Sequence, residues 1–287
     1  MNSRTRTILL TVLAMTCFAG NSLLCRLALR QTSMDAASFT SIRLVSGAAT
    51  LWLCLQMRPG PRRAAGNWPS GLALFAYAAC FSFAYISLPA GTGALLLFGA
   101  VQATMIGYGL ATGETLSGRR LAGLIFASSG LVGLLLPGLA APPFRGAALM
   151  LVAGAAWGVY SLRGRGTDDA TDATAGNFLR AVPFAIGLNL LTLSRSTFDQ
   201  TGIGYAIASG ALASGLGYAM WYAALRGLST SSAAIVQLCV PVIAAAGGIA
   251  LLGELPTLRL LTASLAILGG IALALSTCGR QDRGPTA

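Results

Sequence analysis

The side chains that could carry chemistry are few, and one of them is a charge inside an apolar stretch. Arg43 lies about two helical turns into such a stretch. There an unpaired charge costs at least about 2.5–3.5 kcal/mol if the surroundings are lipid. We expect Arg43 to neutralise a substrate carboxylate or to pair with a gating group. The alternative is that its side chain reaches back to the interface and ties helix ends together.

Three amides also interrupt apolar stretches, at Asn21, Gln102 and Gln237. Amides surrounded by hydrocarbon usually face protein or a wet cavity. An amide both donates and accepts hydrogen bonds, which suits a zwitterionic substrate without fixing the charge of that substrate. Contact between helices explains the three amides equally well.

Aromatic residues recur at helical spacing. Tyr77, Phe81 and Tyr85 are four residues apart and would share one helix face. Further candidates for the same cavity wall are Trp157, Tyr160, Tyr218 and Tyr222. Such a wall accepts apolar or aromatic groups. Lipid contact or interfacial anchoring is the alternative.

Catalysis is excluded by what the chain lacks. It has no histidine, and all 19 cationic side chains are arginine, so the commonest general base, the commonest metal ligand and the Schiff-base lysine are missing. The six cysteines form no Cys-x-x-Cys pair. We therefore predict no enzyme, no metal site and no cofactor. The carboxylates lie at the ends of apolar stretches or between them, which argues against a carboxylate-driven antiporter of cations.

The composition identifies lipid as the solvent. Apolar residues make up 55% of the 287 positions and charged residues 9%, against roughly a quarter charged in soluble domains. The net charge is +11, but the arginines are scattered singly and in pairs at the ends of apolar stretches. This pattern indicates membrane topology rather than nucleic-acid binding.

The apolar stretches predict an all-α integral membrane protein with ten transmembrane helices. We expect these helices at about 7–25, 37–57, 70–88, 91–111, 119–137, 146–162, 176–193, 202–224, 229–252 and 257–277. Most have the length needed to cross a core of about 30 Å. The segment 163–175 between the two halves is predicted to be a solvated loop, with Asp168, Asp169 and Asp172.

The arginine bias predicts the orientation. With the N-terminus inside, the cytoplasmic segments contain twelve arginines: Arg4, Arg6, Arg58, Arg62, Arg63, Arg119, Arg120, Arg163, Arg165, Arg226, Arg280 and Arg283. The outer segments contain five: Arg26, Arg30, Arg145, Arg195 and Arg259. Both termini are therefore expected in the cytoplasm.

The chain also repeats itself. Residues 92–130 align without gaps on residues 232–270, so that Gly113-Glu114 falls on Gly253-Glu254. Two five-helix repeats, 1–138 and 139–287, would then have opposite topology and enclose a central cavity. Glu114 would face the cytoplasm and Glu254 the outside. Gly107, Gly247 and Pro241 are the candidate hinges.

These features resemble the drug/metabolite transporter superfamily, in its EamA-type ten-helix branch. The shared features are the two repeats, the Gly-Glu after the fourth helix of each, Trp157-Gly158 and an arginine early in the second helix. The first repeat departs from the pattern with Phe18-Ala19 where the second has Trp157-Gly158. Taken as a whole, the sequence resembles those of the bacterial exporters in this family that handle aromatic and other neutral amino acids.

The resemblance implies a facilitative secondary transporter in the bacterial inner membrane. It would export neutral or aromatic amino acids, or related small metabolites, by alternating access. The expected partners are the lipid bilayer and the small-molecule substrate, without nucleic acid or an obligate protein partner. The alternatives are a carrier of another solute class, such as nucleotide sugars or drugs, and a membrane receptor or scaffold.

Overall fold

The structure is a computed structural model that describes residues 3–57, 65–113, 118–136, 141–164, 169–228 and 236–275. Within these ranges all regular secondary structure is helical, as the sequence predicts. Several residues used above for repeat and topology lie outside the described ranges: Glu114, Asp168, Arg58, Arg62, Arg63, Arg165, Arg280 and Arg283.

The first half of the chain forms five helices within the described ranges. They are α1 (Ser3–Gln31), α2 (Ala36–Gln56), α3 (Trp68–Tyr85), α4 (Ala90–Ala111) and α5 (Gly118–Leu135). The first helix extends six residues beyond its predicted end at residue 25. Arg26 is therefore a helical residue and is only 4% exposed, so it lies within α1 rather than in the segment that follows this helix.

The described part of the second half contains a 3-10 turn and a π-helix besides its α-helices. Its elements are α6 (Phe144–Arg163), α7 (Ala170–Thr192), a 3-10 turn η1 (Leu193–Arg195), α8 (Gln200–Ala208), the π-helix η2 (Ser209–Leu216), α9 (Gly217–Leu225), α11 (Cys239–Leu252) and α12 (Leu258–Leu275). The elements α8, η2 and α9 follow one another without a break, as a single apolar span of 26 residues. A π-helical segment inside such a span frequently marks a functional site.

Within the described ranges, five helical spans are long and apolar enough to cross a membrane: α1, α2, α4, α6 and the α8–η2–α9 span. Parts of α5, α11 and α12 are shorter apolar helices. Large apolar side chains such as Ile125, Leu190 and Leu265 point outward, as expected where lipid covers the surface. Ten crossings and the inverted topology stay predictions.

Acidic and amide side chains cap the N-terminal ends of several helices. Asp35 accepts hydrogen bonds from two amides in the first turn of α2, and Asp169 does the same for α7. Asn67 and Asp199 each accept from one amide, in α3 and α8. Short polar side chains at these positions satisfy amides that have no partner inside the helix. Asp172 lies in the first turn of α7 and is 9% exposed. The prediction that it lies in a solvated loop is therefore wrong.

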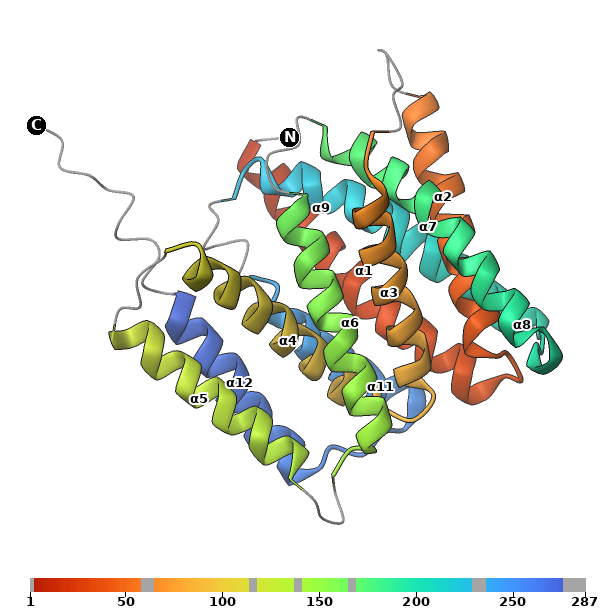
Figure 1. Ribbon diagram of the computed structural model, residues 1–287. Coiled ribbons are helices and arrows are strands. Elements are labelled where there is room, and N and C mark those ends of the chain that lie inside the picture. The colour runs from red at the N-terminus through yellow and green to blue at the C-terminus, as the bar shows by residue number, and fades with distance from the viewer. Residues whose placement is uncertain are drawn as a thin grey trace, which may run out of the picture.

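The helices pack around a central group formed by α1, α3, α4, α6 and η2. Figure 1 shows α5 and α12 side by side at one edge of the molecule, and α2, α7 and α8 at the opposite edge. Helices that the sequence repeat equates make corresponding contacts: α3 packs on α6 as α9 packs on α1. A duplicated five-helix unit would produce this arrangement.

Candidate functional site

A small cavity lies inside the central group of helices. Its wall comes from α1, α3, α4, α6, η2 and α9 and consists of Phe18, Asn21, Tyr77, Phe81, Leu97, Phe98, Trp157, Ala213 and Tyr218. The volume open to the centre of a water-sized molecule is about 20 Å³. This is room for about one water molecule, so the cavity in this structure is too small to hold an organic solute.

Trp157 is the centre of the aromatic part of this wall. Its ring centroid lies 4.9 Å from that of Tyr77, 5.1 Å from that of Tyr218 and 5.3 Å from that of Tyr160. Phe18 packs edge-on against Tyr218 at 5.8 Å. These separations are typical of favourable aromatic pairs. The rings therefore form one continuous wall built from four helices.

A chain of buried hydrogen bonds crosses the same wall. Ser209 donates from Oγ to Oδ1 of Asn21 at 2.6 Å, and Nδ2 of Asn21 donates to the Tyr77 hydroxyl at 3.2 Å. Nη2 of Arg43 donates to the same hydroxyl at 3.1 Å, and Nε of Arg43 donates to Oγ of Ser214 at 3.3 Å. We call these five residues the polar network. It joins α1, α2 and α3 to the π-helix.

The π-helix supplies both serines of the polar network. Ser209 and Ser214 are 0% and 1% exposed and lie five residues apart in η2. Small residues allow η2 to approach α2 closely: a Cβ atom on Gly210 would collide with the Ser46 side chain and the carbonyl oxygen of Arg43. Glycine at this position therefore lets both serines reach their partners.

Arg43 is the largest of the fully buried side chains, at 1% exposure. Its guanidinium carbon lies 5.1 Å from the ring centroid of Tyr77 and 5.0 Å from that of Phe81, within cation–π range. Its Nη1 atom has no hydrogen-bond partner, and among the described residues no carboxylate lies within ion-pair distance of it. Arg43 thus carries a buried positive charge that the described protein groups do not neutralise.

Five of the residues predicted to line a cavity do so: Asn21, Tyr77, Phe81, Trp157 and Tyr218. Arg43 is one layer behind this wall, against the rings of Tyr77 and Phe81.

The other predicted residues lie elsewhere. Tyr160 packs on Trp157, and the ring of Tyr85 packs edge-on against Phe81 at 4.7 Å, but neither residue lines the cavity itself. Gln102 is buried in α4, Tyr222 is half-buried on α9, and Gln237 lies in the turn before α11. The predicted hinges Gly107 and Gly247 lie in unbroken α-helices, and Pro241 is in the first turn of α11.

Phe18 lines the cavity without being among the predicted residues, although the sequence contains a signal for it. The repeat places Phe18 at the position of Trp157, and both rings line the cavity. The two serines of the π-helix gave no such signal, because serine in an apolar helix is common and usually bonds to its own backbone.

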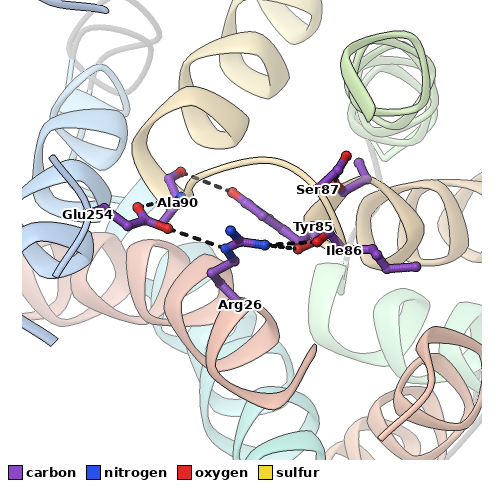
Figure 2. Close-up of polar contacts among 7 residues, drawn as sticks. Arg26, Tyr85, Ile86, Ser87, Ala90 and Glu254 are labelled. Carbon is purple, nitrogen blue, oxygen red and sulfur yellow. Dashed lines mark hydrogen bonds and ion pairs between the residues drawn. The ribbon is translucent and has the colours of Figure 1, made fainter. Parts of the chain in front are cut away.

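An ion pair between Arg26 and Glu254 lies at the C-terminal end of α3 (Figure 2). Nε of Arg26 lies 3.3 Å from Oε1 of Glu254, and Nη1 of Arg26 donates to the carbonyl oxygens of Tyr85 and Ile86 at 2.8 and 3.0 Å. Oε2 of Glu254 accepts from the amide of Ala90 at 2.8 Å. We call these five residues the Arg26 cluster. It joins α1, the α3–α4 turn and the segment after α11.

Local backbone geometry aims Glu254 into this cluster. Gly253 ends α11 in the left-handed conformation, with φ of 64°, and the next amide bonds back to the carbonyl of Gly248. Glycine is favoured at such a position. The carboxylate then satisfies an amide at the start of α4, where negative charge is stabilising.

A second cluster of polar groups lies at the N-terminal end of α3. Arg163 donates to Ser70 from Nε at 3.1 Å and to Oδ1 of Asn67 from Nη2 at 3.2 Å. Asn177 accepts from the Asn67 amide at 3.0 Å. Asp172 accepts from the amide of Ala65 at 3.1 Å through Oδ2, while its Oδ1 has no partner. We call Asn67, Ser70, Arg163, Asp172 and Asn177 the Asn67 cluster.

Comparison with known proteins gives a family for this arrangement. Residues 144–276 match the family described as the EamA-like transporter family. An uncharacterized protein of Pseudomonas aeruginosa is 57% identical over 97% of this chain and 98% of its own length. An uncharacterized transporter of Archaeoglobus fulgidus is 25% identical over 95% of this chain and 98% of its own length. One solved crystal structure, 18% identical, covers 97% of this chain and 100% of its own with a TM-score of 0.66 and shares the fold.

Proposed function

We propose that this chain, whose residues 144–276 match the EamA-like transporter family, exports small organic solutes by alternating access, as a secondary transporter. The solutes are neutral or aromatic amino acids or related metabolites. The observation that carries the proposal is the aromatic cavity, whose wall contains Asn21 and Tyr77 of the polar network. Transporters of this architecture bind their substrate at the interface of the two halves, near the middle of the membrane.

The two polar clusters supply the closures that alternating access needs. The Arg26 cluster and the Asn67 cluster lie at opposite ends of α3, and residues of the cavity wall lie on the same helix between them. A solute can enter when one cluster separates and leave when the other does. Both clusters join helices of the first half to helices of the second half, so their separation requires the halves to move.

Facilitated movement fits the charges of the site better than exchange for a cation. Among the described residues that line the cavity none is a carboxylate, and carboxylates are the usual binding group for a driving proton or a cationic drug. The arginine bias further favours an inner-membrane protein of a bacterium with both termini in the cytoplasm.

Flux from proteoliposomes that contain only the purified protein tests the proposal. The vesicles are preloaded with a panel of neutral, aromatic and charged amino acids, and efflux is followed without any ion gradient. We expect faster efflux of neutral and aromatic members than from protein-free vesicles. Efflux that requires a proton or sodium gradient would replace facilitated with coupled transport. Absence of efflux under both conditions would contradict amino-acid export.

A further inference from the structure

The charge of the site selects the charge of its ligand. The guanidinium of Arg43 is buried, and no described carboxylate lies within ion-pair distance of it. The other members of the polar network, Ser209, Asn21, Tyr77 and Ser214, are neutral side chains. The described residues of the site therefore bear one uncompensated positive charge in surroundings of low polarity, where an anion is favoured and a second cation is disfavoured.

The polar hydrogens left without a partner belong to Arg43 and Tyr77. Nη1 of Arg43 has no partner. The Tyr77 oxygen already accepts from the guanidinium of Arg43 and from Nδ2 of Asn21, so its own proton is left to donate. The acceptors of the network, such as Oδ1 of Asn21, which already accepts from Ser209, are uncharged oxygens. A carboxylate matches the charge of Arg43 and the two free donors, whereas an ammonium group finds no ionised acceptor.

The aromatic faces do not replace the missing acceptor. Arg43 already lies over the rings of Tyr77 and Phe81, so an ammonium group there would face a like charge. Trp157 is covered by three neighbouring rings. The wall is therefore suited to an uncharged aromatic body attached to a carboxylate.

We propose that the site selects aromatic monocarboxylates over the corresponding amino acids and amines, with Arg43 and Tyr77 binding the carboxylate. This inference rests on the proposed function and specifies its substrate class. Tyr77 lines the cavity and Arg43 lies directly behind it, so the carboxylate reaches Tyr77 first. The amino group of a zwitterionic solute finds no ionised acceptor among the described residues of the site and loses its hydration.

The test uses three probes with the same phenylethyl body: 3-phenylpropionate as the anion, phenylalanine as the zwitterion and phenethylamine as the cation. Efflux from proteoliposomes at pH 7.5 is measured beside the shift in thermal unfolding temperature of the purified protein. We expect efflux of 3-phenylpropionate to exceed that of phenylalanine about tenfold or more, since an ammonium group without an acceptor is costly to bury. Phenethylamine should show neither efflux nor a shift.

The possible outcomes distinguish failure of this inference from failure of the proposed function. Phenylalanine efflux equal to or faster than that of 3-phenylpropionate would overturn the inference and leave transport standing. A thermal shift with 3-phenylpropionate without efflux of any probe would support the inference and contradict transport. Neither shift nor efflux with any probe would overturn both.

Variants assign the effect to the two donors. Arg43→Gln and Tyr77→Phe should each remove most of the preference for 3-phenylpropionate over phenylalanine. Tyr77→Phe keeps the buried charge, which makes it the second variant if Arg43→Gln does not fold. Tyr108→Phe is the matched control, because Tyr108 is 54% exposed on α4. An unchanged preference in folded Tyr77→Phe would remove Tyr77 from the site.

Discussion

At the residue scale, one oxygen atom holds the polar network together. The Tyr77 hydroxyl accepts from both Asn21 and Arg43, and these two donors come from different helices. Without that oxygen, two buried donors lose their acceptor. The position of Tyr77 in the cavity wall therefore carries a structural requirement besides any role in binding.

We expect Tyr77→Phe to lower the free energy of unfolding by about 1–3 kcal/mol, the usual cost of leaving buried polar groups unpaired. Thermal unfolding in detergent, compared with the control Tyr108→Phe, measures this. Equal unfolding temperatures for the two variants would show that the hydrogen bonds of Tyr77 contribute nothing to stability.

Asp35 is the residue whose ionisation should affect stability. Burial alone would raise the pKa of Asp35, but hydrogen bonds from Ser38, Thr197 and Ala37 outweigh burial, and the pKa lies below its ordinary value of 3.8. The ionised carboxylate caps α2 and also accepts from the amide of Thr197 at 2.9 Å. Folding thus favours the charged form of this group.

Because the pKa is lower in the folded state, the stabilisation by Asp35 is present above about pH 4 and is lost as the pH falls through the lowered value. Unfolding free energies between pH 6 and pH 3 should fall more steeply for the wild type than for Asp35→Asn, which keeps the cap. Parallel profiles for the two proteins would contradict this role of Asp35.

At the element scale, the π-helix depends on its close approach to α2. A side chain at Gly210 would collide with the backbone of α2 at Arg43, so Gly210→Ala should displace η2 and separate Ser214 from Arg43. We expect a loss of about 1–3 kcal/mol in stability, typical of overpacking, and reduced flux. Gly204→Ala on α8 is the matched control, since its Cβ atom would contact nothing within 4 Å. The same stability in both variants would show that the close approach is not needed.

The Arg26–Glu254 pair links two elements that are 228 residues apart in sequence. Both side chains are largely buried, at 5% and 14% exposure. Removing one partner leaves an uncompensated buried charge, which costs about 3–5 kcal/mol. We expect Arg26→Gln and Glu254→Gln each to lower the unfolding temperature, and the double variant to be more stable than the sum of the two losses predicts. Additive losses would mean that the two charges do not interact.

The sequence predicts the helices well, because runs of apolar residues with polar residues at their ends are a local signal. It also predicts the aromatic wall, because Tyr77, Phe81 and Trp157 recur at helical spacing or at equivalent places in the repeat. It does not reveal the π-helix, since small residues such as Gly210 and Ala213 permit either helical geometry. Nor does it reveal the Arg26–Glu254 pair, because nothing in the sequence near either residue specifies a partner so distant along the chain.

At the scale of the whole molecule, the cavity lies between two polar clusters of different composition, the Arg26 cluster and the Asn67 cluster. The Arg26 cluster contains an ion pair, and its carboxylate also accepts from an amide at the start of α4. The Asn67 cluster, in its described part, consists of hydrogen bonds without an ion pair, and Oδ1 of Asp172 has no partner there. Hydrogen bonds of this kind are weaker than a buried, well-paired charge contact. We therefore expect the Asn67 cluster to separate first, which in the proposed orientation opens the cavity to the cytoplasm and suits an exporter.

The central claim is that solute passes through the aromatic cavity, and filling that cavity tests it most directly. Ala213 lines the cavity and is 3% exposed, whereas Ala246 on α11 is exposed. Efflux from proteoliposomes should be abolished by Ala213→Phe and retained by Ala246→Phe, with both proteins folded and equally reconstituted. Undiminished efflux in Ala213→Phe would contradict the account, because the solute would then cross by another route.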